Sequence, residues 1–415
     1  MKACVFTLGC KVNEVESGSV MSALKSWGVD VTDELCPADI YVLNTCAVTR
    51  EAEKKSRQLV ARARKFNPAA KVYVFGCASE KAPAVFEEKG VTYIGGAQKK
   101  NALIAALARQ LGATYSCFNN EQGYDILPPP VQPRTRAFIK IEDGCNNFCS
   151  YCIIPYLRGR GRSRAAEDIV REVEECGCPE VVLTGINISA YSCGGKTLAG
   201  LMRALAGTKK RVRLGSLECG VIDEDFLSAC AAMADFAPQF HLSLQSGSDA
   251  VLKRMNRHYT RAQYLEKCAL IYRFFPGAAI TTDIIVGFPG ETNEDFEGSL
   301  SIIPQARLAR VHAFAFSPRE GTVAYKMADT PAAVKGERLH RLIEAGNVAA
   351  HKFAQSNLGT VQKVIFEDME DGFTAGYTGN YIKVLCEGDL RGITAEVELV
   401  SEQNSHVSGR IIKFI

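Results

Sequence analysis

Short runs of β-branched and aromatic residues alternate with longer helical patterns in the first part of the chain. Three such runs, KACVFTLG, DIYVLNT and KVYVFG, are separated by helix-like stretches such as EAEKKSRQLVARARKF. Strands that alternate with helices are typical of a parallel sheet covered by helices on its faces. This pattern predicts an open parallel α/β sheet domain over residues 1–122.

The same alternation resumes in residues 136–355 and lasts about twice as long. Six βα units predict a partial or complete barrel, with the strands RAFIKI, EVVLTG, RVRLGS, QFHLSLQ, AITTDIIVG and RVHAFAF. Five short strand-like runs follow in residues 356–415, and they predict a small closed β-barrel: QKVIFED, FTAGYTG, YIKVLC, ITAEVELV and GRIIKFI. Between the first two domains, residues 123–135 (GYDILPPPVQPRT) predict a stiff extended linker because they are rich in proline.

Composition narrows the class of protein. Apolar residues make up 47% of the chain and charged residues 23%, which is ordinary for a globular protein. No run approaches the roughly 18 apolar residues that a membrane helix requires, so we expect no membrane partner. The segment MKACVFTLGC lacks the layout of a signal peptide, and we therefore expect a cytoplasmic protein. Sixteen cysteines in a cytosolic chain indicate metal or redox chemistry rather than disulfides.

Cys145, Cys149 and Cys152 lie in GCNNFCSYC, directly after the first predicted strand of the second domain. Barrel enzymes build their active sites on the loops at this end of the strands. Thiolates select zinc or iron–sulfur clusters, and a structural zinc ion is closed by four ligands. Three thiolates on one tight loop favour a cluster that keeps one iron open for a substrate or cofactor. Zinc completed by a distant residue, or unliganded core cysteines, are the alternatives.

Cys10, Cys46 and Cys77 each follow one of the three predicted strands of the first domain. The carboxyl ends of parallel strands line a common crevice, so these three side chains are expected to converge on a second metal site. The alternative is that they are buried packing residues, because cysteine is common in buried β structure. The ten other cysteines are interpreted as packing or surface thiols.

The whole chain resembles the radical S-adenosylmethionine (SAM) methylthiotransferases. The stretches CIIPYLRGRGRSR, LTGINISAY, HLSLQSGSDAVLKRM, TTDIIVGFPGET and FAFSPREGTVA are similar to the barrel motifs of that family and occur in the expected order. The resemblance implies an amino-terminal methylthiotransferase domain, a (βα)6 radical SAM partial TIM barrel and a carboxy-terminal TRAM β-barrel. It further implies an enzyme that uses SAM and receives electrons from a flavodoxin- or ferredoxin-type donor and sulfur from a sulfur donor.

The same resemblance assigns the cysteines to two 4Fe-4S clusters. Cys145, Cys149 and Cys152 fall on the ligands of the catalytic cluster that binds SAM, and Tyr151 is the aromatic residue before the third cysteine. Cys10, Cys46 and Cys77 fall on the ligands of the auxiliary cluster that holds the transferred sulfur.

The substrate is indicated by the stretch TLGCKVN around Cys10. It resembles the branch of the family that adds a methylthio group to C2 of N6-threonylcarbamoyladenosine at position 37, next to the tRNA anticodon. The isopentenyladenosine branch has Gln-Met after this cysteine, and the branch that modifies a ribosomal-protein aspartate has Pro-Lys. Lys11 and Val12 fit neither, so these two branches are alternatives. A further alternative is an iron–sulfur protein that binds RNA without cleaving SAM.

The cofactor contacts of SAM are less clearly marked. The glycine-glycine-glutamate motif of radical SAM enzymes is absent, and TGINISAY stands in its place. Polar residues at the ends of predicted strands are expected to contact SAM, although each of them is equally compatible with a structural cap. These candidates are Gly185, Asn187, Glu218 and Gln245.

Charge is distributed unevenly along the chain. The net charge is only +3, but residues 49–71 contain eight basic and two acidic residues. The loop LRGRGRSR brings four arginines beside the catalytic cysteines, where phosphate contacts with the anticodon stem-loop are expected: Arg158, Arg160, Arg162 and Arg164. Residues 356–415 contain five basic and nine acidic residues, so the TRAM domain is not expected to supply most of the affinity for tRNA. A solvated helix face is the alternative for residues 49–71. Because threonylcarbamoyladenosine carries a carboxylate, Arg158 or Arg319 is expected to bind it in a bidentate contact.

Overall fold

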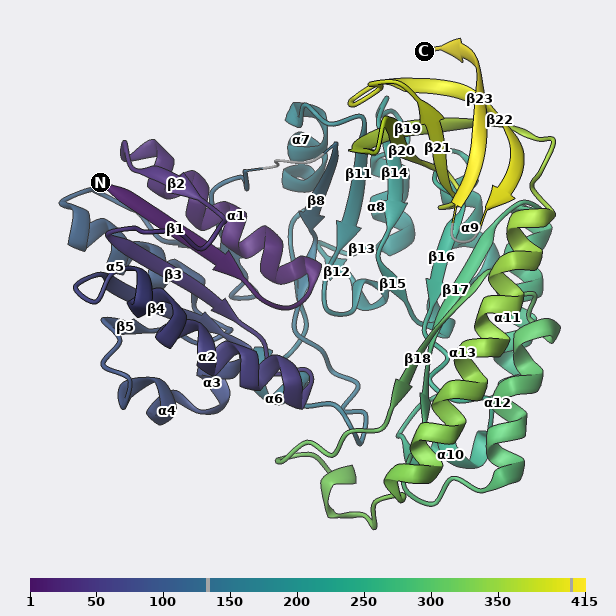
Figure 1. Cartoon of the computed structure of the whole chain (residues 1–415), viewed down its shortest axis with the longest axis horizontal. Helices are drawn as coiled ribbons and strands as arrows, with labels where there is room; N and C mark the ends of the chain where they lie inside the picture. The colour runs from purple at the N-terminus through teal and green to yellow at the C-terminus, as the bar shows by residue number, and fades with distance from the viewer. Residues whose placement is uncertain (132–134, 404–405) are drawn as a thin grey trace.

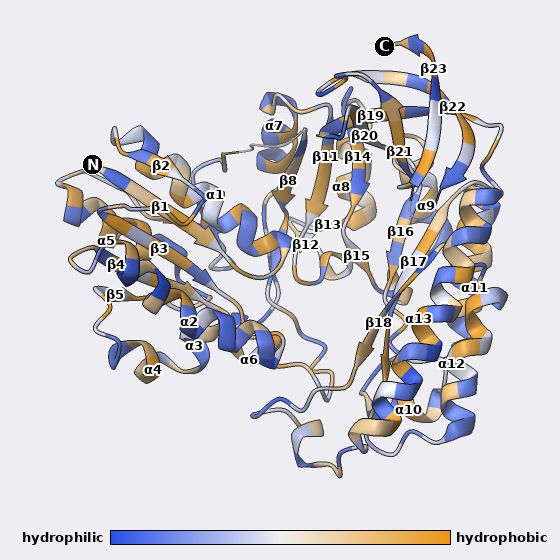
Figure 2. Ribbon diagram, in the orientation of Figure 1, coloured by the Kyte–Doolittle hydropathy of each residue, from blue (hydrophilic) through white to orange (hydrophobic). Residues whose placement is uncertain are grey.

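The computed structural model describes residues 1–131, 135–403 and 406–415. It contains an open parallel sheet, a partial barrel of parallel strands and a closed five-stranded barrel (Figure 1). The three-part α/β architecture predicted from the alternation of strands and helices is therefore confirmed. Figure 2 shows that apolar residues concentrate in the strands, whereas the outer faces of the helices are polar.

The first unit is a parallel sheet with the strand order β2-β1-β3-β4-β5. The central strand β3 is buried at every position, as expected for a strand covered on both faces. Its strands are β1 (Lys2–Thr7), β2 (Asp30–Thr32), β3 (Ile40–Thr45), β4 (Lys71–Gly76) and β5 (Tyr93–Ile94). Its helices are α1 (Lys11–Ser26), α2 (Arg50–Phe66), α3 (Cys77–Lys81), α4 (Pro83–Glu87) and α5 (Lys100–Leu111).

The second unit contains the six predicted parallel strands, in the order β8-β11-β14/β15-β16-β17-β18. Gly215 interrupts the third strand and divides it into β14 and β15. The strands are β8 (Arg136–Lys140), β11 (Glu180–Thr184), β14 (Arg211–Leu214), β15 (Ser216–Leu217), β16 (Gln239–Leu242), β17 (Ala279–Val286) and β18 (Arg310–Ala315). Two short strands, β9 (Glu142–Asp143) and β10 (Arg162–Ser163), flank the loop that follows β8.

Helices cover the outside of the partial barrel and bury its apolar side chains. They are α7 (Ala166–Glu175), α8 (Leu198–Ala204), α9 (Glu224–Ala231), α11 (Arg261–Phe274), α12 (Asn293–Gln305) and α13 (Ala332–Gln355). Two short helices belong to other clusters: α6 (Ile154–Arg158) packs with the first unit, and α10 (Asp249–Arg254) packs with Phe288. The outward side chains of β8, Ala137 and Ile139, pack into this core, whereas the alternate residues Arg136, Phe138 and Lys140 lie outside it. Because alternate residues of a strand share one face, Arg136, Phe138 and Lys140 form the inner face of β8, and this face is largely polar.

The third unit is the predicted small barrel, closed in the order β19-β20-β21-β23-β22. Its strands are β19 (Val361–Glu370), β20 (Phe373–Thr378), β21 (Lys383–Glu387), β22 (Thr394–Gln403) and β23 (His406–Phe414). It caps the end of the partial barrel at which the strands begin, because Arg211 and Arg213 of β14 donate to the carbonyls of Lys363 and Gly379, both at 2.9 Å. This contact couples the third unit to the second.

The proline-rich segment that connects the first two units is packed against both of them. Its β7 (Asp125–Ile126) pairs with β6 (Phe118–Asn119), and the hydroxyl of Tyr124 donates to the carbonyl of Lys140 at 3.3 Å. The amide of Val131 donates to the carbonyl of Gly18 at 3.1 Å. Residues 132–134 of the predicted linker lie outside the described residues. We propose the domain boundaries 1–122, 136–355 and 356–415 on the basis of these elements.

Among the described helices, none is both long and apolar enough to cross a bilayer.

Candidate functional site

The loop that carries Cys145, Cys149 and Cys152 turns back sharply on itself. Gly144 has φ +88°, and a Cβ atom there would lie 2.1 Å from the carbonyl oxygen of Arg160. The amide of Cys145 donates to the carbonyl of Gly159 at 3.1 Å. Gly144 is therefore required because the backbone of the following arginine loop comes so close.

Residues at the end of α10 hold this cysteine loop in place. The side-chain amide of Asn256 donates to the carbonyls of Asn147 and Phe148, at 3.2 and 3.1 Å. Ser150 is fixed through both of its polar groups, since its amide donates to the carbonyl of Met255 at 3.0 Å and its hydroxyl donates to that of Arg254 at 2.8 Å. The three cysteines thus project from a rigid loop, as ligands of a cofactor must.

Polar hydrogens surround the sulfur atoms of this loop. Nη1 of Arg257 lies 3.3 Å from Sγ of Cys149, and the amide of Asn147 lies 3.5 Å from Sγ of Cys145. Burial raises the pKa of the Cys152 thiol to about 12, so binding of a metal must displace its proton. Hydrogen bonds to the sulfurs stabilise the thiolate form and tune the potential of a cluster that they hold.

Cys10, Cys46 and Cys77 follow the adjacent strands β1, β3 and β4, at their carboxyl ends. Glycines permit this approach, because a Cβ atom on Gly9 (φ +121°) would lie 3.1 Å from Cβ of Cys46. A Cβ atom on Gly76 (φ +104°), the residue before Cys77, would lie 2.5 Å from the carbonyl oxygen of Thr45. Burial, and beyond it the neighbouring thiols, raise the pKa of Cys77 to about 11, although Arg158 opposes this rise. The structure places these three cysteines at one edge of the sheet.

Neither set of cysteines forms a compact single-ion site. Within the described ranges, no three His, Cys, Asp or Glu side chains are grouped to hold one metal ion. Zinc bound by thiolates at about 2.3 Å would bring the sulfurs to roughly 3.8 Å from one another. Three thiolates that leave one ligand position open suit an iron–sulfur cluster better than a structural zinc ion, which is closed by four ligands.

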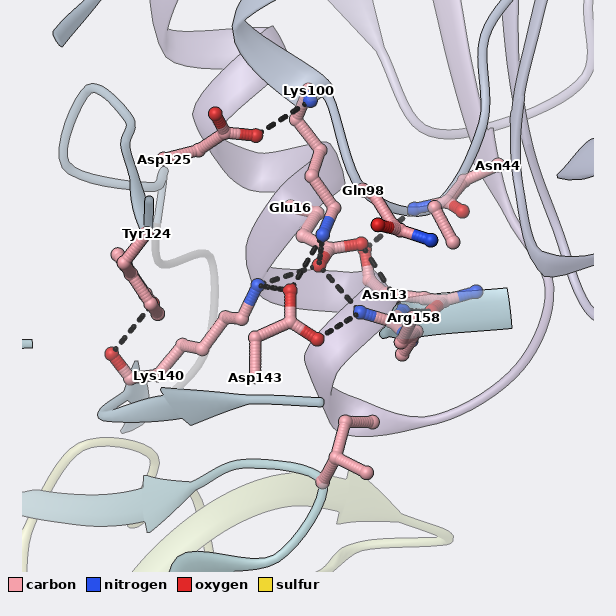
Figure 3. Close-up of polar contacts among 12 residues, drawn as sticks. Asn13, Glu16, Asn44, Gln98, Lys100, Tyr124, Asp125, Lys140, Asp143 and Arg158 are labelled. Atoms are coloured by element: carbon pink, nitrogen blue, oxygen red, sulfur yellow. Dashed lines mark hydrogen bonds and ion pairs between the residues drawn. The ribbon is translucent and has the colours of Figure 1, made fainter. Parts of the chain in front are cut away.

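A buried ionic network joins side chains of the first unit and of the partial barrel (Figure 3). Nη1 of Arg158, from α6, lies 2.9 Å from both Oε1 of Glu16 in α1 and Oδ1 of Asp143 in β9. Lys100 and Lys140 bind the same two carboxylates at 2.6 to 3.1 Å. Burial alone would raise the pKa of Glu16, but Arg158 and the two lysines lower it to about 2. The network therefore joins the first unit to the partial barrel through three basic and two acidic side chains.

The position of Arg158 does not fit the expectation that this residue contacts RNA or the substrate carboxylate. Its side chain is 0% exposed, and its guanidinium also donates to Oδ1 of Asn13 at 2.6 Å. An external carboxylate would have to displace Glu16 or Asp143, each already bound to a buried cation. Arg158 is a structural residue of the domain contact, and we remove it from the proposed substrate contacts.

The other three arginines of the loop differ in exposure. Arg162 donates to the carbonyl of Arg158 at 3.0 Å, and Arg164 lies 2.6 Å from a carboxylate oxygen of Glu172. Arg160 is exposed, and its guanidinium lies 4.5 Å from the ring centroid of Phe148, between the first two catalytic cysteines. Among these arginines, Arg160 is the one whose position best suits a phosphate contact.

Arg319 is also already paired. It is 6% exposed, and its Nη2 donates to the carbonyl of Ala47 and lies 3.0 Å from Oε2 of Glu53. It therefore connects the end of the partial barrel to the loop after Cys46. A bidentate contact with the substrate carboxylate, as expected from the sequence, would require this pair to open.

The predicted SAM contacts are distributed around the cysteine loop. Oε1 of Glu218 accepts from Nδ2 of Asn147 at 2.7 Å and lies 2.8 Å from Nη1 of Arg257. The side-chain amide of Asn187 lies 3.9 Å from Sγ of Cys145, and its Oδ1 has no partner among the described residues. Glu218 and Asn187 stay proposed SAM contacts, because a carboxylate oxygen of Glu218 and the side-chain amide of Asn187 are directed towards the cysteine loop.

The other predicted contacts are placed less directly. A Cβ atom on Gly185 would lie 3.0 Å from the carbonyl oxygen of Glu142, so the glycine allows two strand ends to approach. Gln245, three residues after the end of β16, adopts φ +70°, a conformation that is uncommon for a residue with a side chain. Tyr151 packs edge to face on Phe288 at 6.4 Å, within an apolar cluster. Their roles at the cofactor stay predictions.

Three further residues of this site are not marked in the sequence. Two of them are Arg257 and Asn147, which contact Sγ of Cys149 and Sγ of Cys145, respectively, and both also contact Glu218. Glu142 is 1% exposed, and its Oε2 accepts the amides of Ile186 and Asn187 at 3.0 and 2.7 Å. Burial raises the pKa of Glu142 to about 8, and its Oε1 has no partner among the described residues. The only sequence signal for Glu142 is its place at the end of the first barrel strand.

Comparison with known proteins assigns two parts of the chain to families. Residues 139–303 match the radical SAM superfamily, and residues 2–95 match a family described as uncharacterized protein family UPF0004. The threonylcarbamoyladenosine tRNA methylthiotransferase MtaB of Bacillus subtilis (strain 168) is 34% identical, over 99% of this chain and 96% of the relative. MtaB of Chlamydia pneumoniae is 37% identical over 91% and 89% of the two chains.

Relatives with another name match to a similar degree. The tRNA-2-methylthio-N(6)-dimethylallyladenosine synthase of Syntrophomonas wolfei is 33% identical over 99% of this chain and 98% of the relative. Among solved structures, the radical SAM methyltransferase TsrM of Kitasatospora setae has a TM-score of 0.56 at 14% identity and covers 90% of this chain and 80% of TsrM. The cobalamin-dependent SAM radical enzyme OxsB has a TM-score of 0.53 at 11% identity, over 85% and 57% of the two chains. These structural likenesses support the fold alone.

Proposed function

The chain belongs to the radical SAM methylthiotransferase family, and we propose that it replaces the C2 hydrogen of N6-threonylcarbamoyladenosine at position 37 of tRNA with a methylthio group. One observation carries this proposal. Helix α6, which directly follows the catalytic cysteine loop, contacts α3, and its Leu157 belongs to the same apolar cluster as Cys77 and Ala78 at the start of α3. The two sets of cysteines therefore lie on either side of one domain contact, which is where a sulfur held by one must meet a substrate activated by the other.

The enzyme uses SAM and two 4Fe-4S clusters, which when bound supply the radical that takes the C2 hydrogen atom and the methylated sulfur that replaces it. The side chains of this protein have the remaining tasks. Arg257 and Asn147 donate to the sulfurs of the catalytic loop, and Asn187 and Glu218 are placed to orient SAM beside it. The network around Arg158 holds the two sets of cysteines at a fixed separation. Its charged side chains are buried in the domain contact and shielded from water.

The choice of nucleoside rests on the stretch TLGCKVN and on the MtaB relatives. Relatives of both the threonylcarbamoyladenosine and the dimethylallyladenosine type match over most of the chain. Lys11 and Val12 favour the first type, because a lysine beside the auxiliary cysteines suits a substrate with a carboxylate better than one with an isopentenyl group.

The proposed macromolecular partner is the anticodon stem-loop of tRNA, in the cytoplasm. Exposed basic residues line the outer face of α2 and add to Arg160: Lys54, Lys55, Arg57, Arg62 and Lys65. A flavodoxin- or ferredoxin-type protein is proposed to supply electrons one at a time. Because each turnover consumes a sulfur atom, a sulfur donor must reload the auxiliary site.

The test is incubation of the reconstituted enzyme with SAM, a reductant and three tRNAs, which carry threonylcarbamoyladenosine, isopentenyladenosine or unmodified adenosine at position 37. Nucleosides from each tRNA are then analysed by mass spectrometry. We expect a methylthio gain on the threonylcarbamoyl nucleoside alone. A gain on the isopentenyl nucleoside alone would contradict the proposed substrate, and no gain on any tRNA would favour the protein aspartate instead.

A further inference from the structure

The three units of the protein meet at a group of cations and aromatic rings. Lys11 is the first residue of α1 and directly follows Cys10, and its ammonium lies 5.5 Å from the ring centroid of Phe138 on the inner face of β8. Arg136 of β8 lies 4.9 and 5.3 Å from the rings of Tyr377 and Tyr381 in the third unit. This contact group therefore joins the start of α1, the inner face of β8 and the third unit.

Arg136 and Arg213, which also lies beside the ring of Tyr381, each form an ion pair with a carboxylate. Nε of Arg136 lies 2.5 Å from Oε1 of Glu367, and its Nη2 donates to the other oxygen at 2.8 Å. Arg213 binds the two oxygens of Glu180 at 2.7 and 3.2 Å. Both guanidiniums therefore form bidentate pairs, which satisfy their charge inside the protein.

Lys11 is the exception. Within the described part of the chain, its ammonium forms no ion pair or hydrogen bond. Burial lowers the pKa of Lys11, Tyr381 and Glu14 attract its charge, and Arg136 and Arg213 repel it. One positive charge is thus left over in the contact group, on an exposed side chain. A cation without a carboxylate partner is suited to an anion brought by a ligand.

The pKa of Tyr381 indicates the same excess of positive charge. Burial would raise the pKa of its hydroxyl, but Arg136, Lys11 and Arg213 together lower it below the ordinary value. Tyr381 also adopts φ +70°, a left-handed conformation that bulky residues rarely occupy and that is typically retained where a side chain must be aimed. Its stacking on Tyr377 at 4.8 Å holds an aromatic wall beside the cations.

Space for a nucleoside adjoins this wall. Tyr377 and Tyr381 line a cavity of about 1090 Å³, together with Thr281 of β17 and His312 of β18. Cavities that bind small molecules have typical volumes of about 300–1,000 Å³. Lys11 does not line this cavity itself, but it lies close enough to Tyr381, which does, to lower the pKa of the tyrosine hydroxyl.

We propose that Lys11 binds the carboxylate of the threonylcarbamoyl group and thereby selects this nucleoside over uncharged ones. The inference rests on the proposed function. Its geometric basis is the position of Lys11 one residue, or about 3.8 Å between Cα atoms, from a cysteine of the auxiliary set. A nucleoside held through Lys11 is thus kept beside the site from which the sulfur is transferred.

The test compares two anticodon stem-loop RNAs, one with threonylcarbamoyladenosine and one in which its carboxylate is replaced by a carboxamide. Affinities for the reconstituted full-length protein are measured by fluorescence anisotropy, and methylthio gain is measured by mass spectrometry. Because a charge-assisted contact contributes roughly tenfold or more to affinity, we expect the wild type to prefer the carboxylate RNA by about tenfold. Lys11→Gln should lose this preference with little change for the carboxamide RNA, and Lys11→Arg should retain it.

Lys25→Gln is the matched control, since Lys25 is an exposed lysine in the last turn of the same helix and should leave both affinities unchanged. If Lys11→Gln weakened both RNAs equally, Lys11 would be a phosphate contact and the inference would be wrong. A preference that survives Lys11→Gln would also overturn it. The proposed function fails separately, if the wild type adds no methylthio group to the threonylcarbamoyl RNA but does add one to an isopentenyladenosine RNA.

Discussion

Arg158 of α6 lies 2.9 Å from Glu16 of α1, and both side chains are fully buried. This ion pair joins the helix that follows the catalytic cysteines to the helix that follows Cys10. Removing one partner of a buried pair leaves an uncompensated charge, which costs about 3–5 kcal/mol. We therefore expect Arg158→Met to lower the free energy of unfolding by about 3 kcal/mol, measured by denaturant titration.

The control for this prediction is Arg171→Met, because Arg171 forms an ion pair with Asp168 in which its own side chain is 63% exposed. Surface pairs contribute about 0–1 kcal/mol, so its unfolding midpoint should hardly move. If Arg158→Met left stability unchanged but strongly weakened RNA binding, Arg158 would be an RNA contact after all.

Arg160 is expected to contact tRNA phosphate. We predict that Arg160→Gln weakens binding of an anticodon stem-loop and reduces the slope of log affinity against log salt by about 1. The slope is obtained from anisotropy titrations at several salt concentrations. Arg171→Gln serves again as the exposed control, and an unchanged slope in Arg160→Gln would exclude the phosphate contact.

Glu142 is predicted to make stability depend on pH. Burial raises its pKa in the folded protein to about 8, whereas the unfolded chain releases this proton near the ordinary value of 4.5. The folded state therefore binds more protons between these values, and the stability that this group contributes at low pH is lost as the pH rises through 8.

Glu142→Gln keeps an oxygen for the amides of Ile186 and Asn187 but cannot titrate. The unfolding midpoint of the wild type should fall relative to that of Glu142→Gln between pH 5 and pH 8, in denaturant titrations of the cluster-free protein. Parallel curves for the two proteins would show that Glu142 is ionised throughout.

The strands could be predicted from the sequence because buried parallel strands such as IYVLNT form continuous apolar runs, and the small barrel has strands alone. The positions of Cys10, Cys46 and Cys77 followed from the same pattern, since each one ends a strand of a single sheet. Long-range pairing could not be predicted. Nothing in the spacing of LRGRGRSR distinguishes Arg158 from Arg160, because the partner Glu16 lies 142 residues away in another unit.

Glu142 and Arg257 were missed for a related reason. An acidic residue at a strand end and an arginine after a short helix are both common on protein surfaces, and only the fold buries one and directs the other at Cys149. The pairing of Arg319 with Glu53 likewise depends on the docking of two units.

The central claim is that the two sets of cysteines hold two clusters with different tasks. We expect anaerobic reconstitution to load about eight irons per chain, and replacement of either set of three cysteines by alanine to leave about half. Loss of Cys145, Cys149 and Cys152 should abolish the formation of 5′-deoxyadenosine from SAM.

The most direct measurement quantifies 5′-deoxyadenosine and methylthiolated nucleoside in the same reaction, for the wild type and for the protein with Cys10, Cys46 and Cys77 replaced by alanine. The account predicts that this variant still cleaves SAM to 5′-deoxyadenosine but transfers no methylthio group to tRNA. Continued methylthio transfer by the variant, with its full complement of iron, would contradict the assignment of a separate sulfur-bearing centre to these three cysteines.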